Sequence, residues 1–265
     1  MTKIIHEAGL AIHNRIDLNS DLGESDDPVI VARDIALMDH ISSCNIACGG
    51  HAGNAALMQR MVAEAARRGL AIGAHPSYPD RENFGRVSIP MNDQDLADSL
   101  IGQITALSGL CEKAGVRMTH VKPHGALYND AADSPRIARL VAAAVSEAAP
   151  GAALCGLAHS AMATSAQEMG VRFWAEAFAD RRYRCNHRLL PRTMPGSILS
   201  DESERIAQAL AIAQHQNVLS NDGNAITIHA DTLCLHSDSP GAMESVAAVR
   251  RALEEAGFEI CSPER

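Results

Sequence analysis

Seven short β-rich segments alternate with amphipathic helical segments along most of this 265-residue chain. The expected strands cover residues 16–19, 44–48, 70–75, 118–122, 152–157, 171–177 and 232–236. Between them, apolar residues recur at helical spacing in the segments 57–65, 137–145 and 242–253. Strands and helices that alternate in this way form a parallel sheet, either closed into a barrel or open and doubly wound.

Local signals mark the ends of the expected helices. Ser134-Pro135 and Ser239-Pro240 each place a capping hydroxyl before a proline at the first helical position. A glycine follows four of the helical runs, as expected at helix ends: Gly69, Gly115, Gly170 and Gly257. No low-complexity linker divides the chain, so we expect one domain over residues 16–265 and an N-terminal extension over residues 1–15.

Polar side chains follow almost every expected strand at its carboxyl end. They are Asp17, Asn19 and Asp21, then His51, His75, Lys122 and His124, and later Glu176, Asp180, His236 and Asp238. Barrels gather catalytic groups from the carboxyl ends of many strands, whereas open sheets use two or three at a switch point. Because six strands contribute here, the sequence favours the closed (β/α) barrel.

The composition excludes several classes of partner. The formal net charge is −9 and the aromatic residues are one Trp, three Tyr and four Phe, which argues against nucleic acid. No apolar run approaches the roughly 20 residues of a membrane span, and residues 1–14 lack the apolar stretch of a secretory signal. The seven cysteines are dispersed, so we expect a cytoplasmic protein without a disulfide framework.

Three common motifs are absent from the sequence. The chain has no Gly-Lys dipeptide and therefore no phosphate-binding GxxxxGK[ST] loop. It has no GxSxG nucleophile elbow, and no GxGxxG follows a strand. A standard ATP loop, a serine hydrolase elbow and a dinucleotide fingerprint are thereby excluded.

The histidines that follow strands suggest a site for a divalent metal or for acid–base chemistry. Imidazole and carboxylate groups together suit zinc, manganese or iron. The alternative is that each histidine only binds loop backbone, and the matching positions of three histidines at strand ends favour the site over it. Lys122 is one of three lysines, and at a strand end it either polarises a carbonyl oxygen or lies along the barrel rim. The arginine-rich run over 181–192 is expected to be a solvated or partner-facing loop.

Seven sequence motifs, in order, resemble the LamB/YcsF lactam-utilisation family. They are IDLNSDLGES (16–25), NIACGGHAG (45–53), AIGAHPSYPDRENFGR (71–86), HVKPHGALYND (120–130), EAFADRRY (176–183), PRTMPGSIL (191–199) and DTLCLHSDSPGA (231–242). The resemblance implies a seven-stranded parallel (β/α) barrel, similar to the NodB-like and YdjC-like deacetylase barrels. Family members resemble the A subunit of the ATP-dependent bacterial 5-oxoprolinase, which works with separate B and C subunits.

The resemblance implies hydrolytic opening of 5-oxo-L-proline to L-glutamate with ATP as co-substrate, bound at a site of another kind or shared with a partner chain. The hypothesis assigns water activation to Asp21 and His51, with His75, and charge stabilisation to Lys122 and His124. Substrate binding is assigned to Asp17, Asn19, Glu24, Asn45, Tyr128 and Asp238. By analogy with the deacetylases, a divalent metal would be held by Asp21, His51 and His124.

Other functions remain open on the sequence. The chain departs from the family's usual motifs at Ser20, at residues 26–34, at Gly50 and at Asn54, and these changes bear on the substrate more than on the fold. One alternative is a metal-dependent hydrolase that acts alone on another cyclic amide or an acetylated substrate. Another is a non-catalytic subunit that binds a small acid. The sequence leaves the oligomeric state open, a homo-oligomer included.

Overall fold

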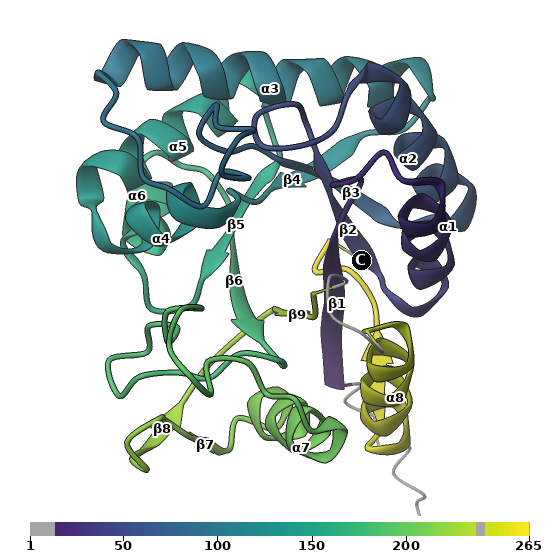
Figure 1. Cartoon of the computed structure of the whole chain (residues 1–265), viewed down its shortest axis with the longest axis vertical. Coiled ribbons are helices and arrows are strands. Elements are labelled where there is room, and N and C mark those ends of the chain that lie inside the picture. Colours follow the sequence, from purple (N-terminus) through teal and green to yellow (C-terminus); the bar gives the residue numbers. More distant parts are fainter. Residues whose placement is uncertain (1–13, 237–241, 265) are drawn as a thin grey trace, which may run out of the picture.

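Seven parallel strands pair in a ring in the computed structural model, which describes residues 14–236 and 242–264 (Figure 1). The ring consists of β1 (Asn14–Leu22), β2 (Ser43–Ala47), β3 (Ala71–His75), β4 (Met118–Val121), β5 (Ala153–Leu157), β6 (Phe173–Phe178) and β9 (Thr232–Cys234). The barrel closes where Asp17, Leu18 and Asn19 of β1 pair with β9. A further strand, β10 (Phe258–Ile260), pairs with the first residues of β1. The prediction of a closed seven-stranded barrel is confirmed.

Helices surround the ring of strands (Figure 1). They are α1 (Pro28–Leu37), the short 3-10 helix η1 (Met38–His40), α2 (Ala55–Arg68), α3 (Asp93–Lys113), α4 (Gly125–Asp133), α5 (Pro135–Ala148), α6 (Ala161–Glu168), α7 (Glu202–Ala213) and α8 (Ala242–Glu255). The sequence did not predict the antiparallel hairpin of β7 (Asn217–Leu219) and β8 (Ala225–Thr227), which lies beside α7. Within the described residues, no helix has the length and apolar character needed to cross a membrane.

The predicted helix ends have the expected backbone geometry. The Ser134 hydroxyl accepts a hydrogen bond from the Ile137 amide at the start of α5, with Pro135 at the first helical position. The four predicted terminal glycines, at 69, 115, 170 and 257, all have φ between 67° and 88°, in the left-handed region that favours glycine. Ser239-Pro240 lies outside the described residues.

The apolar core lies between the outer faces of the strands and the helices. The buried face of α2, which includes Leu57, Met61 and Val62, packs toward β2 and β3. Burying each such side chain contributes about 1.5–3 kcal/mol to folding. The β1 side chains Ile16, Leu18 and Leu22 belong to the same core. The outer face of β1 is therefore the apolar face of the strand.

The inside of the barrel is polar, whereas barrels of this kind are usually filled with branched aliphatic side chains. Side chains alternate along a strand, so Asp17, Asn19 and Asp21 of β1 point away from the apolar core. Their partners come from other strands of the ring. The Asn19 amide donates hydrogen bonds to Glu176 of β6 at 3.0 Å and to Thr232 of β9 at 2.7 Å.

Asp17 is a deeply placed carboxyl group of this interior and is 1% exposed. It accepts hydrogen bonds from the hydroxyls of Ser42 (2.5 Å), Ser43 (2.6 Å) and Thr232 (2.6 Å). Burial raises its pKa from 3.8 to about 6, against the lowering effect of these three hydroxyls.

The raised pKa of Asp17 predicts a pH-dependent stability. Because the folded-state pKa lies above the unfolded-state value, the folded chain binds the extra proton between about pH 4 and pH 6. The contribution of Asp17 to the free energy of unfolding therefore falls as the pH rises through this window. Relative to an Asp17→Asn variant, the wild-type chain should lose about 2 kcal/mol between pH 4 and pH 7 in urea unfolding. A difference that does not change with pH would contradict this assignment.

Candidate active site

A pocket of about 540 Å³ opens at the carboxyl ends of the barrel strands. Its floor includes Asp21 near the end of β1, His75 at the end of β3 and Lys122 directly after β4. Residues of α4 and the loop that follows β6 form the facing wall. This volume lies within the range of small-molecule binding sites. The pocket lies at the carboxyl end of the barrel, where the sequence placed the candidate chemistry.

The floor of the pocket is organised by the ammonium group of Lys122, which is 2% exposed. Its Nζ lies 2.7 Å from a Glu176 carboxylate oxygen, 3.0 Å from Asp21 Oδ1 and 3.2 Å from Asn19 Oδ1. Burial alone would lower the pKa of Lys122, but nearby negative charge, that of Asp21 foremost, raises it well above its usual value. The three N–H groups therefore have acceptors within the protein, and Lys122 is charged.

Asp21 presents an ionised carboxylate to the pocket. Its Oδ1 accepts hydrogen bonds from Lys122 and from the Asn45 amide at 2.9 Å, and its Oδ2 lies 3.3 Å from His75 Nε2. Burial alone would raise the pKa of Asp21, but His75 and Lys122 outweigh it and hold the pKa well below its usual range. The side chain is therefore an ionised carboxylate at neutral pH.

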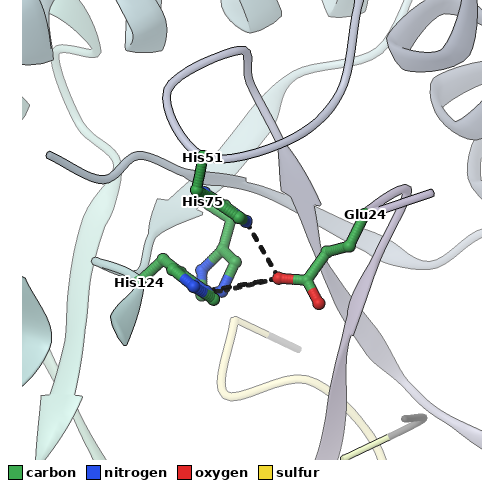
Figure 2. Close-up of side chains that lie close together, drawn as sticks. All are labelled: Glu24, His51, His75 and His124. Atoms are coloured by element: carbon green, nitrogen blue, oxygen red, sulfur yellow. Dashed lines mark hydrogen bonds and ion pairs between the residues drawn. The ribbon is translucent and has the colours of Figure 1, made fainter. Parts of the chain in front are cut away.

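Beside Asp21, the side chains of Glu24, His51, His75 and His124 converge on one point (Figure 2). Glu24 Oε1 lies 2.9 Å from His51 Nε2, 3.2 Å from His124 Nδ1 and 3.9 Å from His75 Nε2. The rings of His51 and His124 stack with centroids 3.6 Å apart, and Phe84 packs edge-on against both. We call these four residues the Glu24–histidine cluster.

Burial sets the charge of two of the four residues in this cluster, and their neighbours set that of the other two. It lowers the pKa of His51 to about 4 and also lowers that of His124, so both rings are neutral at neutral pH. Burial would raise the pKa of Glu24, but its contacts with His124 and His51 lower it below its usual range. The pKa of His75 is raised, because the charge of Asp21 outweighs the effect of burial.

The donor atoms of the cluster fit a divalent metal ion. One atom from each residue lies within 4.8 Å of the others, and imidazole nitrogens with a carboxylate oxygen are ligands that transition metals accept. The sequence-based ligand set was Asp21, His51 and His124. The geometry brings in Glu24 and His75, while Oδ1 of Asp21 accepts from Lys122 and Asn45 and its Oδ2 lies 3.3 Å from His75 Nε2.

The other predicted substrate-binding residues lie at different depths. Tyr128, on α4, lines the pocket and donates its hydroxyl to Glu176 at 2.7 Å. Asn45 lies beneath Asp21, and Asp17 and Asn19 lie in the barrel interior and do not line the pocket. Asp238 lies outside the described residues.

The sequence assigned no role to Glu176, which is fully buried and pairs with Lys122. The sequence signal for such an ion pair was a single carboxylate within an apolar strand, because a buried charge requires a partner. The sequence favoured a solvated or partner-facing loop over an anion site for the arginine-rich run, and in the structure Arg184 is exposed. Arg181, Arg184, Arg188 and Arg192 line the same pocket as Asp21.

Known proteins resemble this chain over nearly its whole length. The model of the LamB/YcsF family matches residues 16–265. A protein of Chloroflexus aggregans, named as the A subunit of 5-oxoprolinase, is 43% identical over 248 residues, which are 94% of this chain and 98% of that protein. The crystal structure of a lactam utilization protein from Thermus thermophilus has a TM-score of 0.87 at 38% identity, over 94% of this chain and 99% of that one.

The ion pairs of Lys122 predict a specific pattern of stability. Lys122→Met should lower the free energy of unfolding by about 3–5 kcal/mol, because Asp21 and Glu176 then remain buried without their cation. Adding Glu176→Gln should recover part of this loss, since it removes one of the two unpaired charges. Denaturant unfolding measures both variants.

The matched control is Lys113→Met, which changes an exposed lysine in the last turn of α3 and should alter stability by no more than about 0.5 kcal/mol. A double variant that is no more stable than Lys122→Met would show that Glu176 does not depend on Lys122 for its charge.

Proposed function

The chain belongs to the LamB/YcsF family, and on that basis we propose that it opens the ring of 5-oxo-L-proline to give L-glutamate, as the A subunit of an ATP-dependent 5-oxoprolinase. The observation that carries the proposal is the pocket itself. It joins an ionised carboxylate, Asp21, to the Glu24–histidine cluster on one side and to an arginine-lined wall on the other. These groups match a reaction in which water attacks an amide that carries a carboxylate.

In this proposal Asp21 is the general base. A five-membered lactam is a resonance-stabilised amide, so the attacking water must lose its proton to a positioned acceptor as the bond to carbon forms. Asp21 lines the pocket, while Lys122 and Asn45 hold its Oδ1. Lys122 acts as a positioning residue, because its own N–H groups are already bonded to acceptors in the protein.

A divalent ion held by the Glu24–histidine cluster would supply Lewis acidity and lower the pKa of a water bound to it. The chain's own contribution is to enclose the donor atoms at this end of the pocket. His51 is 2% exposed, and Phe84 and the stacked ring of His124 cover it. In such surroundings, electrostatic effects on the reacting amide are stronger than in water.

The arginine-lined wall would bind the carboxylate of 5-oxoproline. A guanidinium group binds a carboxylate through two parallel hydrogen bonds, which fixes orientation as well as position. Arg181 supports the loop that forms this wall, since its guanidinium group donates hydrogen bonds to the carbonyl oxygens of Leu190 and Ser197. Arg184 and Arg192 line the pocket beyond it. This arrangement turns the lactam amide toward Asp21.

ATP and partner chains belong to the same proposal. Lactam hydrolysis gains little free energy, and transfer of the ATP γ-phosphoryl group to the amide oxygen would make the amide carbon a better electrophile. One water adds to that carbon, the C–N bond breaks as the nitrogen takes a proton, and a second water hydrolyses the resulting acyl phosphate. The net reaction converts 5-oxoproline, ATP and two waters into glutamate, ADP and phosphate. Because the sequence has no phosphate-binding loop, we propose that the ATP site is formed with candidate B and C subunits.

A second candidate function is a metal-dependent amide hydrolase that works alone on another cyclic amide or an acetylated substrate. The Glu24–histidine cluster is the observation that favours it, because a metal-activated water needs no ATP to attack an amide. The dependence on ATP and on partner chains separates the two functions.

The proposed role of Asp21 predicts a loss of turnover without loss of binding. Asp21→Asn should lower kcat for glutamate release from 5-oxoproline by about 10²–10⁴-fold, measured with ATP and the candidate B and C subunits. The control Asp98→Asn changes an exposed residue of α3 and should leave kcat unchanged. 5-Oxoproline should raise the melting temperature of both variants.

Two results would contradict the proposal. Full turnover by Asp21→Asn would remove Asp21 from the chemistry. The absence of glutamate under every condition, together with ATP-independent hydrolysis of another amide by the isolated chain, would favour the second function.

A further inference from the structure

The Glu24–histidine cluster contains a contact that neutral side chains cannot satisfy. His75 Nε2 and His124 Nδ1 lie 3.0 Å apart and face each other. On the other side of each ring, His75 Nδ1 lies 2.7 Å from the carbonyl oxygen of Lys122, and His124 Nε2 lies 3.0 Å from that of Phe84. A carbonyl oxygen only accepts hydrogen bonds, so both of these ring nitrogens must carry a hydrogen.

These backbone contacts fix the tautomers of both rings. In a neutral imidazole with a hydrogen on one nitrogen, the other nitrogen offers a lone pair. The facing atoms of His75 and His124 are therefore two lone pairs at 3.0 Å, and Glu24 Oε1, another acceptor, lies 3.9 and 3.2 Å from them. Asp21 Oδ2, a further acceptor, lies 3.3 Å from His75 Nε2. Acceptors that face one another in this way require a cation between them, either a proton or a metal ion.

We propose that this cation is one divalent first-row transition-metal ion, bound by Glu24, His51, His75 and His124. A tetrahedral ion with bonds of about 2.0–2.1 Å has ligand atoms about 3.3 Å apart. The distances from Glu24 Oε1 to the three rings, 2.9, 3.2 and 3.9 Å, lie around this value. The inference deepens the proposed function and rests on it only for the statement that the ion faces the reacting amide.

The surroundings favour a metal ion over a single proton. Metal-binding histidines commonly donate their second N–H to a backbone carbonyl, as His75 and His124 do here. The local charge also favours a metal ion. The carboxylates of Asp21 and Glu176 share the ammonium group of Lys122, and Glu24 adds a third negative charge beside them.

The chemistry of the donors selects the kind of metal. Three imidazoles and one carboxylate suit zinc, iron, nickel or copper, whereas magnesium and calcium prefer oxygen ligands. Asp21 also lies near Cys234 and His236, which form a second group of donor atoms. Burial raises the pKa of the Cys234 thiol well above its usual value, and its sulfur lies 3.2 Å from Lys122 Nζ. That group is therefore a poor site for a cation.

The test is metal binding by the isolated chain, without ATP, substrate or partner subunits. After the chain is stripped with a chelator, calorimetric titration with Zn²⁺ should give one tight site per chain, and Mg²⁺ should not compete for it. Glu24→Gln and His124→Ala should each weaken Zn²⁺ binding by about a hundredfold or more. Asp21→Asn should weaken it less than Glu24→Gln does. Circular dichroism melting checks that each variant is folded.

The matched control addresses a competing surface site. His215 and His229 lie at the surface with their Nδ1 atoms 3.3 Å apart, so they form a weak zinc-binding pair. His229→Ala should retain the tight site. The proposal is overturned if His229→Ala alone abolishes binding, or if the wild-type chain binds Zn²⁺ no more tightly than Glu24→Gln and His124→Ala. Because the assay involves no turnover, a failed 5-oxoproline reaction leaves its result unaffected.

Discussion

The buried ammonium group of Lys122 is the interaction on which the rest of the site depends. A charge that leaves water is costly unless it is paired and hydrogen-bonded, and here the partners come from other strands of the barrel. Lys122 follows β4, whereas Asp21 lies on β1 and Glu176 on β6. The ion pairs therefore tie three strands together and hold the carboxylate of Asp21 ionised at the floor of the pocket.

The polar interior requires space as well as charge balance. His120 is fully enclosed, donates to Asn45 and is kept neutral by burial, which lowers its pKa to about 3. It fits because residue 73 of the neighbouring strand β3 is glycine, since a Cβ atom there would lie 2.3 Å from His120 Nε2. Asn45 in turn donates to Asp21. A glycine in a strand thus contributes to the orientation of the proposed base through two intervening side chains.

Much of this arrangement could be predicted from the sequence. The seven strands were found from short β-rich runs between helical segments, and the polar residues at their carboxyl ends favoured a closed barrel. His51, His75 and His124 meet because they lie at or after the ends of β2, β3 and β4, which are neighbours in the ring. The sequence could not show which carboxylate after β1 turns toward them, since that depends on the loop path at Glu24. It also offered no role for Glu176, and the arginine-lined wall was missed because an irregular loop has no periodic pattern.

The central claim is that the lactam binds over Asp21 with its amide toward the Glu24–histidine cluster. A crystal structure of the chain with 5-oxo-L-proline tests it most directly. The account predicts the ring carbonyl carbon beside Asp21 and the substrate carboxylate against Arg184 or Arg192. A ligand bound with its amide turned toward the arginine-lined wall, or bound outside this pocket, would contradict the account.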